Sequence, residues 1–376
     1  MQNPRLIAAF ALSALLAACS GNVGESGSEG QLGTQASAIQ GGTMDTNAAH
    51  NFAVGVANRR GGVCSGTLIA PNLVLTARHC VVPPSQDDSV TCTDTFEPNV
   101  APSALSVTTE PNLYRAKSYY AAAEIITPVS SAFCGNDIAL IILAKNIPAT
   151  EAEPAIPVVQ FNMTDARLSG SITAMGYGIT NPSATDSGQR RIRQNIPLLC
   201  VPGSKRMDCT GENAKFSDDP AEFVTEGYVC SGDSGSGAFD QRSFEKGATP
   251  YVLGALSRGP QTKDKCLAAI YSRTDAHGKL IVDAALKAAA LGEYTPPDWT
   301  LTRPGSVGPK DNAPPCDGDT CADTHATNLA ASEAATPAAA STGCSVANGT
   351  TGTSGGLALA GLALAGVFVA RRRRAR

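Results

Sequence analysis

Short apolar runs, each interrupted by turn-forming residues, fill the chain between residues 39 and 291. The clearest runs occupy residues 67–70, 73–76, 138–143, 171–177 and 251–257. Pro71 and Asn72 separate the first two runs, which is the pattern of two strands joined by a tight turn. Because Gly (37) and Pro (24) are plentiful and aromatic residues make up only 5% of the chain, the pattern predicts turn-rich β structure.

One helix is predicted near the end of this region. It would begin near Thr274 and Asp275, and its apolar face would consist of Leu280, Ile281, Ala284, Ala285 and Ala288. Pro154 and Pro157 lie in a polar, acidic connection that would divide the region into halves at about 39–155 and 156–291.

The first 19 residues have the pattern of an export signal. Arg5 precedes an apolar run over residues 6–18, which is too short to span a bilayer stably. The run ends in Leu-Ala-Ala-Cys19, which resembles a bacterial lipobox; that resemblance implies that Cys19 is lipidated and becomes the mature N-terminus. The alternative is an ordinary cleaved signal peptide, and both predict export from the cytoplasm.

A second sorting feature stands at the C-terminus, within residues 344–376. Residues 355–370 are apolar, and four consecutive arginines follow them. With Cys344 in a Gly-Cys-Ser context, this segment resembles the MYXO-CTERM sorting tails of surface proteins. The resemblance implies cleavage near Cys344 and attachment at the cell surface by membrane sorting machinery, with possible release to the medium. A plain membrane anchor is the alternative.

Two polar segments separate these signals from the globular region. Residues 20–38 are rich in Gly, Ser, Glu and Gln, so they predict a flexible pro-segment. Residues 292–343 shift to Pro, Ala and Thr, which predicts a linker. Cys316 and Cys321 would close a small loop within it.

Export and charge exclude two classes of function. In an oxidising compartment twelve cysteines indicate disulfides, and the ten outside the sorting signals form an even set. None of them has the C-x-x-C spacing of a zinc site, so no metal is expected. The net charge is −4 and Lys and Arg are scattered outside the C-terminus, so no nucleic-acid partner is expected.

Three stretches carry residues suited to nucleophilic catalysis. They are Thr-Ala-Arg-His79-Cys, Asn-Asp137-Ile-Ala-Leu and Gly-Asp-Ser234-Gly. A serine hydroxyl becomes a nucleophile when an imidazole accepts its proton and a carboxylate holds that imidazole in the right tautomer. The chain supplies one of each in the order His, Asp, Ser.

With that order, residues 39–291 resemble the trypsin/chymotrypsin family of serine proteases. The resemblance implies two packed antiparallel β-barrels with a C-terminal helix, and a serine endopeptidase that acts on proteins or peptides without a cofactor. In the family pattern His79 is the base, Asp137 orients it, and Ser234 attacks the scissile carbonyl. The amides of Gly232 and Ser234 would form the oxyanion hole.

The family pattern also implies disulfides and an activation step. The pairs would be Cys64–Cys80, Cys200–Cys209 and Cys230–Cys266, with Cys92–Cys134 as an additional bridge. Ile39-Gln-Gly-Gly resembles the start of mature family members. A cut between Ala38 and Ile39 would free an amino group that pairs with Asp233, and the activating protease would not be trypsin-specific. The alternative is that Ile39 simply begins the first strand.

Substrate preference rests on the residues that the resemblance assigns to the specificity pocket: Tyr228, Ser257, Arg258, Gly259 and Ala269. Tyr228 stands where trypsin-like members carry Asp, and Arg258 stands where tryptophan is usual. A bulky Tyr228 and a wall Ala269 favour small or medium uncharged side chains. Arg78 beside the histidine and Ser236-Gly237 after the serine also depart from the family pattern.

Two other functions use similar features. A non-catalytic protease-like module for binding or adhesion would normally lose one member of the triad, and all three are present here. An esterase with the same groups would normally place its Asp and His after the serine, in that order. The sequence therefore favours a peptidase.

Overall fold

The computed structural model describes residues 39–59, 62–83, 91–247 and 249–301. The predictions for Cys19, Cys316, Cys321 and Cys344, and for the segments 1–38 and 302–376, lie outside the described residues. Among the described helices, none is both long enough and apolar enough to cross a membrane.

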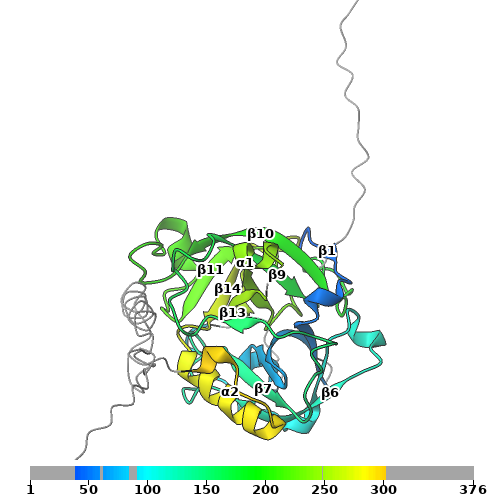
Figure 1. Ribbon diagram of the computed structural model, residues 1–376. Helices are drawn as coiled ribbons and strands as arrows, with labels where there is room; N and C mark the ends of the chain where they lie inside the picture. Colours follow the sequence, from blue (N-terminus) through cyan, green and yellow to red (C-terminus); the bar gives the residue numbers. More distant parts are fainter. Residues whose placement is uncertain (1–38, 60–61, 84–90, 248, 302–376) are drawn as a thin grey trace, which may run out of the picture. The chain divides into compact units, whose positions relative to one another are not determined.

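Six antiparallel strands close the first barrel in the order β2-β3-β4-β7-β6-β5. Figure 1 labels two of them, β6 and β7. Their bounds are β2 Ala53–Asn58, β3 Val63–Ala70, β4 Leu73–Thr76, β5 Leu105–Thr108, β6 Tyr120–Ile126 and β7 Ala139–Leu143. The predicted turn at Pro71 and Asn72 is confirmed, because Ala70 pairs directly with Leu73 across it. Every residue of β4 and β7 is buried, which explains their continuous apolar sequences.

The second barrel is a ring of six antiparallel strands, β9-β10-β11-β14-β13-β12, in which β12 pairs back with β9. Their bounds are β9 Ser171–Gly176, β10 Arg191–Cys200, β11 Glu222–Glu226, β12 Gly237–Asp240, β13 Tyr251–Arg258 and β14 Ala268–Arg273. Two short strands extend this sheet: β1 Thr43–Met44 pairs with β10, and β8 Ile156–Pro157 runs parallel to β13. The predicted all-β class with two barrels is confirmed.

The C-terminal helix α2, Gly278–Gly292, packs against the first barrel, beside β7 (Figure 1). Ile281, Ala284, Ala285 and Ala288 are fully buried and join that barrel's apolar core. The helix begins after the expected position because the Thr274 hydroxyl is bonded to carbonyls of β13. Short helical turns occupy the loops: α1 Gln241–Glu245, η1 Ala48–His50, η2 Arg78–Cys80, η3 Pro102–Ala104, η4 Leu113–Arg115, η5 Gly211–Lys215 and η6 Asp298–Thr300.

Both ends of the described region have defined contacts. Ile39, the first described residue, is fully buried in the core of the second barrel. An apolar side chain is drawn to that core because burial removes it from water. At the other end, the Gln160 side chain donates to the carbonyls of Trp299 and Leu301, so ordered structure continues past residue 291.

Candidate functional site

Strand pairing in the first barrel brings His79 and Asp137 together. Strand β4 ends at Thr76, and His79 follows in the turn η2. Asp137 precedes β7, whose first residue, Ala139, pairs with Thr76. Because β4 and β7 are antiparallel neighbours, the residue after one and the residue before the other meet at the same edge of the sheet.

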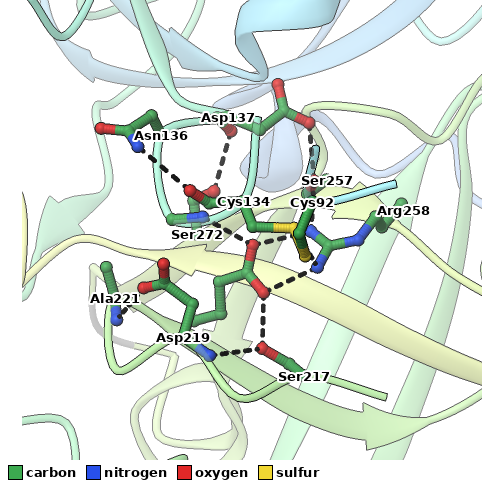
Figure 2. A network of polar contacts seen from close by, with 12 residues as sticks. Cys92, Cys134, Asn136, Asp137, Ser217, Asp219, Ala221, Ser257, Arg258 and Ser272 are labelled. Carbon is green, nitrogen blue, oxygen red and sulfur yellow. Dashed lines mark hydrogen bonds and ion pairs between the residues drawn. A yellow bond between two sulfur atoms is a disulfide. The ribbon is translucent and has the colours of Figure 1, made fainter. Parts of the chain in front are cut away.

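The carboxylate of Asp137 holds the imidazole of His79 in one orientation. The distance from His79 Nδ1 to Asp137 Oδ2 is 2.8 Å, and the His79 backbone amide donates to Asp137 Oδ1 at 2.9 Å. Asp137 is fully buried and also accepts a hydrogen bond of 2.6 Å from Ser257 Oγ (Figure 2). With Nδ1 committed to the carboxylate, Nε2 is the ring nitrogen left for proton transfer.

Burial and charge act on this pair in opposite directions. Burial alone would lower the pKa of His79, but attraction to the Asp137 carboxylate and the hydrogen bond to it leave that pKa raised. Burial alone would raise the pKa of Asp137, but the charge and hydrogen bond of His79 leave it lowered. Asp137 therefore stays ionised at neutral pH and stabilises an imidazolium when His79 takes up a proton.

Ser234 comes from the second barrel and is tied to the first. The amide of Ser65, in β3, donates to the Ser234 carbonyl at 2.8 Å. The next residue, Gly235, has φ +80° and lies so close to β4 that a Cβ there would come within 2.1 Å of Thr76 Oγ1. Only glycine fits this junction without displacing a neighbour, so the backbone around Ser234 is held against the first barrel.

His79 and Ser234 line one cavity of about 880 Å³. The two side chains do not form a hydrogen bond in the described structure; the His79 ring bonds to Asp137 instead. Such bonds are often long before substrate binds and shorten in the reacting complex. The arrangement therefore brings a hydroxyl, an imidazole and a buried carboxylate to one cleft between the barrels.

The loop before Ser234 presents two free backbone donors. Gly232 has φ +90° and packs on Gly178, whose Cα would lie 2.8 Å from an added Cβ. Within the described part of the chain, the amides of Asp233, Gly235 and Ser236 donate to carbonyls, whereas those of Gly232 and Ser234 have no acceptor. Two unpaired N–H groups beside a nucleophile can receive the negative oxygen of a tetrahedral intermediate.

Asp233 is fully buried and accepts hydrogen bonds from the amides of Cys230 (3.0 Å) and Gly178 (2.8 Å). Burial raises its pKa to about 7, even though both amides favour the ionised form. Because burial disfavours the ionised form of this carboxyl, a cation placed beside it would stabilise that form.

The residues assigned to the specificity pocket separate into two groups. Ser257, Arg258 and Gly259 line the cavity, whereas Tyr228 and Ala269 are not among its described lining residues. Tyr228 has φ +89°, and its ring packs under the guanidinium of Arg193, 3.5 Å from carbon to ring centroid. Ala269 is fully buried in the core of the second barrel.

The described residues contain four disulfides: the three pairs that the family pattern implies and the expected additional bridge, Cys92–Cys134. They join Cys64–Cys80, Cys92–Cys134, Cys200–Cys209 and Cys230–Cys266. Cys64, His79 and Cys80 lie close enough together to suggest a metal site. Metal binding requires thiolates, however, and both sulfurs are consumed in one disulfide.

Two residues near the site that depart from the family pattern, Arg78 and Ser236, form contacts with neighbouring residues. The Arg78 guanidinium bonds to the carbonyls of Pro128 and Ser130 and lies 4.6 Å from the Phe96 ring centroid. Ser236 is fully buried, and its amide donates to the Asp233 carbonyl.

Sequence reasoning missed three residues that support the site. Ser272 Oγ donates to the Asp137 carbonyl (Figure 2). Ser65 Oγ donates to the Gly232 carbonyl, and Glu222 binds Arg258. Serines in strands carry no recognisable signal. An arginine ending the apolar run 251–257, however, indicates that a buried acid must lie nearby.

Two barrels with a serine facing a histidine–aspartate pair in the cleft between them define the chymotrypsin-like class of serine peptidases. The family model for trypsin matches residues 39–281, which is more than half of the chain. The chain therefore belongs to the trypsin family. A search of curated proteins found no match.

Proposed function

We propose that this protein is a serine endopeptidase with Ser234, His79 and Asp137 as its triad. His79 Nε2 takes the proton of Ser234 Oγ as that oxygen bonds to the scissile carbonyl carbon. The same proton passes to the leaving amine as the C–N bond breaks, which leaves an acyl-enzyme. Water, deprotonated by His79, then forms the new C–O bond and releases Ser234 with its proton restored.

The observation that carries this proposal is the completely buried Asp137, 2.8 Å from Nδ1 of a histidine that shares a cavity with Ser234. The free amides of Gly232 and Ser234 support an oxyanion hole beside it. A non-catalytic module would have no need of such a charge arrangement, which costs desolvation free energy. The chemistry uses only side chains and backbone amides, so no cofactor is required.

We further propose a preference for small or medium uncharged side chains before the cut. The cavity near Ser234 includes Val229 and Leu256, and its one described cation from the second barrel, Arg258, is paired with Glu222. The acids that line the cavity, Asp94 and Glu97, come from the segment before β5. None of the described lining residues from the second barrel is acidic, so nothing beside Val229 would pair with a basic side chain.

Hydrolysis of a peptide library that varies this position is the test of the function. The expected result is cleavage with an order of preference led by Ala, Val and Leu, and no product from the Ser234→Ala protein. A strong preference for Arg would refute the assigned pocket. No cleavage of any peptide by correctly processed protein would instead favour the binding module.

Activation by a cut between Ala38 and Ile39 is the second part of the proposal. Ile39 is fully buried, and the Gln40 amide donates to the Tyr228 carbonyl at 2.5 Å. Asp233 is also fully buried; the charge of Arg191 acts on it, but it forms no ion pair among the described residues. Ile39 also has φ +46°, which is strained for a β-branched residue. Breaking the peptide bond before Ile39 would relieve that strain and supply an ammonium for Asp233.

Linkage predicts how the uncut and cut forms respond to pH. A carboxyl whose pKa is raised by folding binds its proton more tightly in the native state, so its stabilising effect is present at low pH and lost as pH rises. For Asp233 the window is from about 4 to about 7, with a slope of at most about 1.4 kcal/mol per pH unit. Urea unfolding of Ser234→Ala protein should show this slope in the uncut form and lose it after the cut.

Asp233→Asn in the uncut form is the matched control, and it should also remove the slope. N-terminal sequencing of the active protein should begin at Ile39. Equal slopes in the cut and uncut forms, or an active form that starts upstream of Ile39, would contradict the activation proposal.

The sorting signals complete the proposal: export, a lipid on Cys19 and surface attachment near Cys344. The motif resemblances in the sequence support them. A cut before Ile39 would separate the protease domain from Cys19, so only the C-terminal signal could then keep the active domain at the surface. The mass of the mature protein, measured together with its N-terminal sequence, would show which ends remain.

A further inference from the structure

Arg258, the last residue of β13, forms a buried ion pair that reaches across the second barrel to β11. Its Nη1 and Nη2 atoms lie 2.7 and 2.9 Å from the two carboxylate oxygens of Glu222. Glu222 is fully buried and the Arg258 side chain is 15% exposed. A two-pronged pair of this kind fixes the plane of the guanidinium as well as its position.

The Glu222 carboxylate has two further donors that hold it in place. The amide of Gly135 donates to Oε1 at 2.9 Å, and Ser217 Oγ donates to Oε2 at 2.6 Å. Gly135 lies two residues before Asp137 in the chain. The same carboxylate therefore anchors Arg258 and the segment that leads into Asp137.

The guanidinium makes two contacts on the side facing Asp137 (Figure 2). Nη1 lies 3.3 Å from Ser257 Oγ, and Nη2 lies 3.2 Å from Cys134 Sγ in the disulfide with Cys92. Ser257 Oγ in turn donates to Asp137 Oδ2 at 2.6 Å, the oxygen that faces His79 Nδ1.

A serine hydroxyl has a single proton. When its oxygen accepts an N–H from a cation, that proton must point elsewhere, and here the Asp137 carboxylate receives it. The cation also polarises the hydroxyl, so the hydroxyl becomes a stronger donor in this water-poor environment.

We propose that Arg258 and Glu222 form a positioning pair for Asp137, acting through Ser257 and through the segment 134–135. The inference rests on the proposed triad and adds two residues that act on Asp137 without forming a hydrogen bond to His79. Arg258 then helps to position the residues that transfer the proton, and its role is not to form the wall of the specificity pocket.

Other charged groups surround this network and stay constant in the test. Arg78 approaches Asp137 from η2, and Asp219 approaches Glu222 from the loop before β11. His277 Nε2 lies 2.9 Å from the Gly135 carbonyl, and burial lowers its pKa to about 4, so it is neutral above pH 5.

Removing Glu222 alone and removing both members of the pair should have different effects on the pKa of His79. Glu222→Gln keeps an oxygen for Gly135 but leaves the Arg258 charge uncompensated, so protonation of His79 becomes harder. The acid limb of the kcat/KM profile should move down by about half a pH unit. Adding Arg258→Met to Glu222→Gln removes the uncompensated charge, so the acid limb of the kcat/KM profile should return to its original position or above it. In this double variant kcat/KM at pH 7 should be about tenfold lower than in the wild type, with KM little changed.

Arg258→Lys, with Glu222 retained, keeps the positive charge but cannot form the two-pronged bond to the carboxylate. Its rate should be close to that of the wild type, well above the rate of the double variant. The matched control is Asp45→Asn with Arg190→Met, which removes another buried ion pair, with 2.9 Å between Asp45 Oδ2 and Arg190 Nε. It should lower thermal stability without moving the acid limb.

The same variants in a Ser234→Ala background allow the His79 Nδ1 proton to be followed by NMR, which needs no turnover. If the wild type does not hydrolyse peptides, the proposed function fails, yet the NMR titration still tests the pair. An unmoved titration in both variants would overturn the positioning role. So would a loss confined to KM for acidic peptides, because Arg258 would then be a substrate-binding residue.

Discussion

Ser234→Ala is expected to lower kcat by about a million-fold relative to the cut, active protein. Without the hydroxyl no acyl-enzyme forms, and His79 has no proton to transfer. The barrels should remain intact, because the contact that ties residue 234 to β3 uses its backbone carbonyl. Hydrolysis of the best library peptide, followed over days, measures the residual rate, and circular dichroism checks the fold.

His79→Ala provides the comparison for this loss. Residues that act as one unit lose activity together, so the double variant should be no slower than either single variant. Additive losses in the double variant would mean that Ser234 and His79 act independently, which would contradict the triad.

Asp137→Asn is expected to lower kcat by about 10⁴-fold. An asparagine has only one acceptor oxygen, so its NH₂ group would face either the His79 amide, which donates to Oδ1, or Ser257 Oγ and His79 Nδ1, which both lie at Oδ2. Those donors lie 2.6 to 2.9 Å from the carboxylate oxygens. The imidazole would then hold its proton on the wrong nitrogen, and the imidazolium would lose its counter-charge.

The control for this change is Asp283→Asn on the exposed face of α2, where the carboxylate pairs with Lys279. It should leave kcat within about twofold of the wild type, since exposed helical pairs contribute about 0.3–0.5 kcal/mol. If Asp137→Asn behaved like this control, Asp137 would not be the orienting acid.

Much of the fold followed from local patterns. Strand β4 and the end of β3 were predicted because fully buried strands have continuous apolar sequences, and Pro71-Asn72 marked the turn between them. The face of α2 followed from helical spacing in the same way. Strand β10 was missed because only Ile192 is apolar among its first five residues, Arg-Ile-Arg-Gln-Asn, and because its register shifts between Arg193 and Ile196, which breaks the alternation expected of a strand.

The site was predictable as residue types but not as geometry. His79, Asp137 and Ser234 carry motif signals, whereas the direction of a side chain depends on distant partners. Tyr228 illustrates this limit: its positive φ and its contact with Arg193 direct its ring away from the cavity. Arg258 is drawn to a buried carboxylate in a strand 36 residues earlier, and no local pattern records that pairing.

The most direct measurement of the central claim is labelling with a fluorophosphonate, followed by mass spectrometry of the modified peptide. Such reagents react with a serine only when a base has activated it, so they report the relation between Ser234 and His79 itself. The account predicts one label per cut chain, on Ser234, absent in His79→Ala and in Ser234→Ala. Correctly cut, folded protein that takes up no label, or takes it up at another residue, would contradict it.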